Sequence, residues 1–385
     1  MRSDKTTRNR TRGLSLVELL VAITLGAIIL AGAVTLFVNN RDTYKTTNEL
    51  SRLQETARYA LNMMVKDIRM AGFFGCADRL DTVTPNVPNV PAGIAGWLWD
   101  FNLNPAAGAI APPIEGFEAA LPGNNFMPSG FGVTVGNNGI GGQVLAGSDA
   151  ITLRYVAGSM IDVNPANGVF DLLVTPGDVI IGTNSAVNVD SSAGLVMNQV
   201  TAISDCGGSD IFQINAATTA TSVQANNLSR GYNTVTSPML APFFGVRYYI
   251  GDNGRGPGGE VYPSLYRTII TPPDPAVVVP TAPTETSQEL FEGVERLQLL
   301  YGVDTSGNGI PDNYVRAGDP PLDAAGAANW ANVVSVRISM LVRTVDRHGR
   351  DLDTLVYQIN DVAFGPANDQ RRRRVFTTTA MVRNL

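Results

Sequence analysis

The sequence contains only two cysteines and one histidine in 385 residues, and this scarcity excludes several classes of function. Two cysteines cannot form a disulfide scaffold, and Cys76 and Cys206 lack the spacing of a metal site. The single histidine, His348, excludes sites built from several imidazoles and leaves little for acid–base or nucleophilic catalysis. No glycine-rich phosphate loop joins a predicted strand to a helix. We therefore predict that the protein is not an enzyme.

Charge is scarce along one stretch near the N-terminus. Residues 14–38 are almost wholly apolar, and Glu18 is their only ionisable side chain. As a helix the stretch would be about 37 Å long, enough to cross a bilayer with some tilt. The small residues at 31–33 also allow a cleaved secretory signal, but Glu18 lies inside what would be its apolar region. We predict a retained membrane anchor at residues 14–38.

A short basic leader, residues 1–13, precedes the apolar stretch. Its five cations outnumber its single acid, so the rest of the chain is more acidic than the overall charge of −6. The positive-inside rule places the leader in the cytoplasm and the remainder outside. Such an acidic remainder is a poor general binder of nucleic acid, and none is expected as a partner. The cations are Arg2, Lys5, Arg8, Arg10 and Arg12.

Helical periodicity continues through residues 39–72 without a proline. One apolar stripe recurs at three- and four-residue steps, while the charged side chains are predicted to fall elsewhere on the helix. Gly72 is a plausible C-terminal stop. The stripe comprises Leu50, Leu53, Ala57, Leu61, Met64, Ile68 and Ala71, and the charged set comprises Arg52, Glu55, Arg58, Lys66 and Asp67.

Residues 73–385 read as a loop-rich sheet domain, so the predicted fold class is α+β. Residues 75–145 are dense in Gly, Pro and Asn and indicate long loops, and residues 272–288 read as an exposed linker. Residues 333–345 and 352–359 are expected to pair as a hairpin, and the run Arg371–Arg374 reads as a solvated turn. The predicted strands are 150–156, 178–181, 195–203, 245–250, 264–270, 294–303, 333–345, 352–359 and 375–382.

The two cysteines have two readings. If the sheet domain is periplasmic, the oxidising compartment favours a Cys76–Cys206 disulfide that closes a loop of about 130 residues. The alternative is a pair of separate buried thiols.

Residues 304–312 resemble a calcium loop in spacing. Oxygen-bearing groups recur at every second position, and Gly309 falls where such loops turn sharply. Val315 stands where an EF-hand loop has its bidentate glutamate, so another loop would have to complete the coordination. The alternative is an ordinary turn after a strand. The candidate ligands for Ca²⁺ are Asp304, Ser306, Asn308, Asp312 and the carbonyl of Ile310.

The N-terminal pattern resembles that of type IV prepilins. The stretch Gly13-Leu14-Ser15-Leu16-Val17-Glu18 combines the residue before a cleavage point, a new N-terminus and one acid four residues on. Within the type IV pilin-like family the chain is most similar to the PilW minor pilins. The other supporting stretches are residues 69–76, 292–298, 301–304 and 373–379.

The resemblance implies a long N-terminal helix packed on an antiparallel sheet and cleavage between Gly13 and Leu14 by the prepilin peptidase, which then methylates the amine of Leu14. Leu14 stands at the position where major pilins usually have Phe. An unpaired carboxylate buried in a membrane costs roughly 2.5 kcal/mol or more, so Glu18 is expected to pair with such an amine. The alternative is that Glu18 lies at the lipid interface.

The function that the resemblance implies is that of a minor pilin that primes pilus assembly and sits at or near the tip. The implied partners are other minor pilins, the major pilin and a tip adhesin, with the chain first in the inner membrane and then at the cell surface. A type II secretion minor pseudopilin of the GspJ kind is the alternative within the same machinery class. A membrane-anchored periplasmic binding domain that never polymerises is the alternative from another class.

Overall fold

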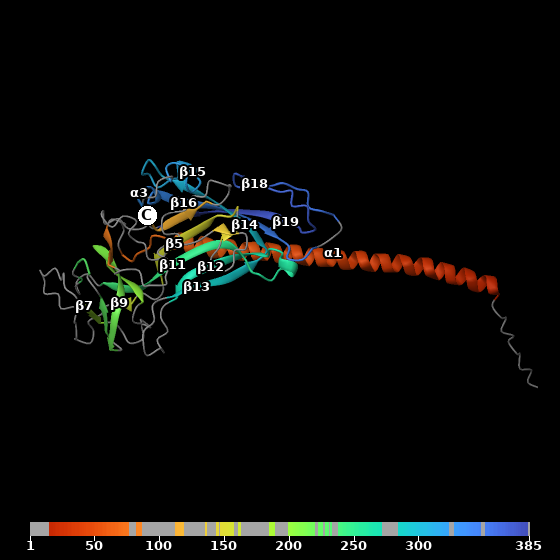
Figure 1. Ribbon diagram of the computed structural model, residues 1–385, viewed down its shortest axis with the longest axis horizontal. Coiled ribbons are helices and arrows are strands. Elements are labelled where there is room, and N and C mark those ends of the chain that lie inside the picture. The colour runs from red at the N-terminus through yellow and green to blue at the C-terminus, as the bar shows by residue number, and fades with distance from the viewer. Residues whose placement is uncertain are drawn as a thin grey trace, which may run out of the picture.

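The computed structural model describes most of the N-terminal helix and the sheets that follow it (Figure 1). The described residues are 15–76, 82–86, 112–118, 135–136, 144–145, 147–157, 161–162, 185–188, 199–219, 222–225, 228–230, 232, 238–271, 284–322, 327–347 and 351–383. The leader, Leu14, His348 and the predicted strand at 178–181 lie outside them.

A single helix, α1 (Leu16–Met70), dominates the shape of the molecule. Its 55 residues correspond to about 83 Å of helix, and its N-terminal half projects from the sheet domain (Figure 1). Ala71 caps the helix, and Gly72 follows with φ of 80°, a conformation that glycine adopts without strain. The predicted uninterrupted helix and its glycine stop are confirmed.

The rest of the described chain is mainly β-structure. A four-stranded sheet has the order β15-β14-β16-β19, and its pairs are antiparallel. An 11-stranded sheet runs β13-β12-β11-β8-β9-β10-β7 with four strands off this path, and its β1–β9 pair is parallel. The α+β prediction is confirmed. The elements are β1 (Val83–Asn86), β2 (Ile114–Phe117), β3 (Val135–Gly136), β4 (Val144–Leu145), β5 (Ala150–Val156), β6 (Ile161–Asp162), β7 (Ser185–Asn188), β8 (Val200–Asp205), β9 (Gly208–Thr219), β10 (Ser222–Ala225), β11 (Met239–Asp252), η2 (Pro257–Gly259), β12 (Pro263–Thr271), β13 (Thr284–Glu292), β14 (Val294–Val303), β15 (Asn313–Val315), α3 (Ala327–Trp330), β16 (Val333–Arg343), β17 (Tyr357–Ile359), β18 (Val362–Phe364) and β19 (Arg373–Met381).

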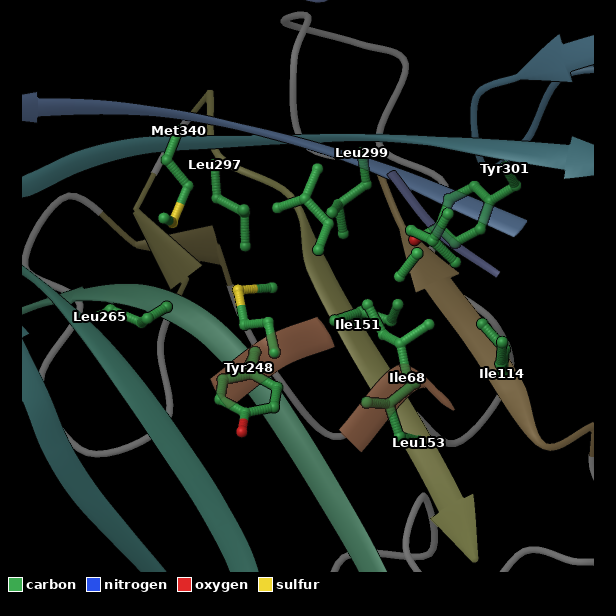
Figure 2. Close-up of a cluster of buried hydrophobic side chains, with 14 of the residues drawn as sticks. Ile68, Ile114, Ile151, Leu153, Tyr248, Leu265, Leu297, Leu299, Tyr301 and Met340 are labelled. Atoms are coloured by element: carbon green, nitrogen blue, oxygen red, sulfur yellow. The ribbon is translucent and has the colours of Figure 1, made fainter. Parts of the chain in front are cut away.

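The hydrophobic core lies where the C-terminal half of α1 meets both large sheets. Ile68 of α1, Ile151 of β5, Tyr248 of β11 and Leu299 of β14 belong to one buried cluster (Figure 2). Side chains from one helix face and alternate strand positions thus fill a common interior. The strands β7, β9 and β10 lie at the end of the molecule farthest from the projecting half of α1 (Figure 1).

Several strand predictions match closely, and the misses concern pairing. β5 and β14 have the predicted bounds, whereas β11 begins earlier than predicted because it spans several partners, β5, β6, β8 and β12. The predicted hairpin of 333–345 with 352–359 is wrong. β16 pairs instead with β14 and β19, and Tyr357–Ile359 pairs with β18. The predicted linker is wrong over residues 284–288, which belong to β13 and pair with β12.

The prediction of a solvated arginine turn is also wrong. Arg371 is 2% exposed and Arg373 is 9% exposed, and both form ion pairs. Arg374, the next residue along β19, is exposed. The alternation has a simple cause, because successive side chains of a strand point to opposite faces.

Candidate functional site

The projecting half of α1 presents apolar side chains that nothing in the described chain covers. Every residue from Ser15 to Lys45 is exposed, and Glu18 lies in the first turn among these side chains. The most apolar 18-residue window has a mean hydropathy of 2.5, and none of it is buried. Within the described ranges, α1 is the one helix long and apolar enough to cross a membrane. The large apolar side chains that are exposed here are Leu16, Val17, Leu19, Leu20, Val21, Ile23, Leu25, Ile28, Ile29, Leu30, Val34, Leu36, Phe37 and Val38.

The second half of α1 is held by the sheet domain. Leu53, Ala57, Met64 and Ile68 are at most 3% exposed, as the apolar stripe predicted. Leu50, the first member of the stripe, is 37% exposed, so burial begins one turn later than predicted. The same helix is therefore bare at one end and embedded at the other.

Asp67 anchors the embedded half by a polar contact that was not predicted from the sequence. Its carboxylate accepts hydrogen bonds from Tyr155 Oη at 3.0 Å and Tyr248 Oη at 2.5 Å, and it pairs with Arg267 Nη2 at 3.0 Å. Burial, reinforced by the neighbouring charge of Asp67, raises the pKa of both tyrosines, so they stay neutral donors.

The helical spacing contained a signal for this contact. Asp67 lies three residues after Met64 and four before Ala71, so it belongs to the buried stripe by position. The prediction that Asp67 falls elsewhere on the helix than the apolar stripe is wrong. The three partners come from β5, β11 and β12, and their approach to Asp67 is visible only in the folded chain.

The chain just after α1 is pinned to the sheet domain by hydrogen bonds and a disulfide. Gly72 N donates to the carbonyl of Arg154 at 3.0 Å, and Val156 N donates to the carbonyl of Phe73 at 2.7 Å. Cys76 and Cys206 are bonded, with their Cα atoms 4.7 Å apart and 130 positions between them. The predicted disulfide is confirmed, and the alternative of separate thiols is excluded.

A cluster of buried ion pairs ties β19 to its neighbours. Arg373 contacts Glu295 at 2.6 Å, Asp369 at 2.7 Å and Asp353 at 3.0 Å. Although desolvation opposes it, hydrogen bonding from Arg373 lowers the pKa of Asp369 to about 2. Arg371 pairs with Glu260 at 2.7 Å. These contacts stabilise the sheet on which α1 rests.

The predicted calcium loop is a tight turn in which backbone N–H groups donate hydrogen bonds to the carboxylates. Asp304 accepts hydrogen bonds from Ser306 N, Gly307 N and Gly309 N at 2.6–3.0 Å. Although desolvation opposes it, the hydrogen bonds from Gly309 N and Gly307 N lower the pKa of Asp304. Asp312 accepts from the N and Oγ1 of Thr305.

A calcium ion in this loop would have to share the carboxylates with those donors. Among the described residues, no three His, Cys, Asp or Glu side chains are grouped to hold a metal. Calcium binding by Asp304, Ser306, Asn308, Ile310 and Asp312 therefore stays a prediction. Calorimetric titration of the detergent-solubilised chain with millimolar calcium tests it, and the absence of binding heat would contradict it.

Comparison with known proteins finds family matches at both ends of the chain. Residues 8–34 match the prokaryotic N-terminal methylation motif, which covers Gly13, Leu14, Glu18 and the start of the exposed half of α1. Residues 247–384 match the family described as type IV pilus-assembly protein W, and this range includes β12 to β19. No curated protein and no solved structure gives a significant match to the chain. With the methylation motif at one end and this match at the other, the chain matches a type IV pilin-like protein of the PilW type.

Proposed function

We propose that the protein is a minor pilin that primes assembly of the type IV pilus and sits at or near its tip. The observation that carries the proposal is the bare apolar half of α1, which continues as one helix into a half that is anchored by packing, ion pairs and the disulfide. Such a helix connects a membrane segment rigidly to a folded domain. It is suited to leave the membrane as a unit and pack among like helices.

The maturation steps follow from the same end of the chain. The prepilin peptidase cuts between Gly13 and Leu14 and methylates the new amine. Glu18 then pairs with that amine or with that of a neighbouring subunit, since a buried carboxylate without a cation is penalised in a helix bundle. Before assembly the leader is cytoplasmic and the sheet domain is periplasmic.

The position near the tip is supported by where the strands lie. β7, β9 and β10 extend the domain at the end opposite the bare half of α1 (Figure 1). A large extension in that place crowds subunits stacked in a shaft, but an end position accommodates it. The partners are other minor pilins, the major pilin and a tip adhesin.

Mass spectrometry of this chain from sheared pili tests cleavage, methylation and location together. We expect an N-terminal peptide that begins at N-methylated Leu14. A chain found uncut, cut elsewhere or confined to the inner membrane would contradict the proposal. Deleting the gene should abolish twitching, whereas loss of exoprotein secretion with normal twitching would favour the pseudopilin function.

A further inference from the structure

Two long described strands form sheet edges, and they differ in how they are protected. β13 carries Glu285, Glu289 and Glu292, and its pairing with β12 is interrupted by a register shift. Charges and irregularities of this kind prevent unwanted pairing at an edge. β19 has the sequence RRVFTTTAM, with its charges confined to the first two residues. Its nine-residue register with β16 is unbroken. β19 is therefore an edge without the usual protection.

The hydrogen bonds around β19 show which of its residues face the open side. Val382 N donates to the carbonyl of Val334, and Thr344 N donates to that of Arg372, each at 2.9 Å. Antiparallel pairs alternate in bonding, so even-numbered residues of β19 direct their backbone groups toward β16. The odd-numbered residues direct their N–H and C=O groups outward, and these are Arg373, Val375, Thr377, Thr379 and Met381.

A groove of about 440 Å³ lies between this edge and the embedded half of α1. Phe376 and Thr378 line it from β19, and Leu61, Arg58 and Arg69 line it from α1. No carboxylate is among the groove-lining residues, so the groove is cationic. β19 lies alongside α1 where the helix leaves the domain (Figure 1).

We propose that the β19 edge is a docking surface for an extended, acidic segment of another protein subunit, which adds to the sheet as a further strand. The outward backbone groups would bond the added strand about 4.8 Å from β19. Every second side chain of that strand would then point into the groove, where Arg58 selects carboxylates. This inference does not depend on pilus assembly, because it concerns the chemistry of the edge alone.

In-cell crosslinking of the full chain tests the proposal. The photo-crosslinking residue p-benzoylphenylalanine replaces Met381, an exposed outward-facing residue, and the adduct is digested and sequenced by mass spectrometry. The same crosslinker at the exposed Gln288 of β13 is the positional control. We expect an adduct at Met381 with a carboxylate-containing peptide from another protein, and none at Gln288.

A second substitution decides whether backbone pairing holds the partner. Thr379→Pro removes one outward N–H, and edge strands tolerate proline in this orientation. The adduct should fall at least tenfold with Thr379→Pro and persist with Thr379→Val, which keeps the N–H. The charge reversal Arg58→Glu leaves β19 intact and should lower the yield severalfold.

Three outcomes would overturn the proposal. They are an adduct with lipid, an adduct unaffected by Thr379→Pro in a variant that melts like the parent, and an adduct unaffected by Arg58→Glu. If the proposed pilin function alone is wrong, the adduct still forms, but with a protein that is not a pilus subunit.

Discussion

The two halves of α1 are one continuous helix, yet their apolar side chains are covered in different ways. From Leu53 onward the helix buries them within its own chain, whereas residues 16–38 leave them for a membrane or for neighbouring helices. The helical backbone is the same throughout, so the difference is one of partners. Changes in the embedded half should therefore alter the stability of the isolated chain. Changes in the bare half should alter assembly alone.

The largest expected effect is at the junction that fixes the end of the embedded half. Replacing both Cys76 and Cys206 by serine opens a loop of 130 positions. The chain-entropy model predicts a loss of about 4–5 kcal/mol in the free energy of unfolding. Urea unfolding of the detergent-solubilised chain, followed by tyrosine fluorescence, measures the loss. An unchanged midpoint would show that the hydrogen bonds after Gly72 fix the end of the embedded half without the disulfide.

Asp67→Ala should weaken the embedded half next most strongly. The substitution leaves Tyr155 and Tyr248 without an acceptor and Arg267 without its counter-charge in a buried site. We expect about 3 kcal/mol of destabilisation. Asp42→Ala on an exposed part of the same helix is the matched control and should change the free energy of unfolding little. Equal effects of the two variants would refute the anchoring role.

Acid should loosen the sheet that supports the embedded half. The folded-state pKa of Asp369 is about 2, below its ordinary value near 4. The contribution of Asp369 to the free energy of unfolding is therefore complete above pH 4 and disappears as the pH falls toward 2. The expected loss is about 1–2 kcal/mol. Thermal melts across this range should show the decline in the parent, and a smaller decline in Asp369→Asn. Identical slopes would place the acid sensitivity elsewhere.

The smallest expected effect concerns the bare half of α1. It alters the free energy of incorporation into the pilus and leaves folding unchanged. Glu18→Gln removes the charge that is to meet a subunit amine, and pilus incorporation should fall at least tenfold, equivalent to about 1.4 kcal/mol. Glu18→Asp keeps the charge and should retain part of the incorporation. Quantitative immunoblotting of sheared pili, with leader cleavage checked in parallel, measures both. Unaltered incorporation of Glu18→Gln would remove the pairing from the mechanism.

The sequence by itself determined the length of α1, its bare and embedded halves, the position of Glu18, and strands such as β5 and β14. Each follows from periodicity or composition over neighbouring residues. The tertiary structure decided that Asp67 is buried, that Arg371 and Arg373 lie inside an ion-pair network, and that β16 pairs with β14 and β19. Those outcomes depend on residues far apart in the chain, so no local pattern could specify them. The edge of β19 belongs to the same class, because a strand is at an edge only when its neighbours have been placed.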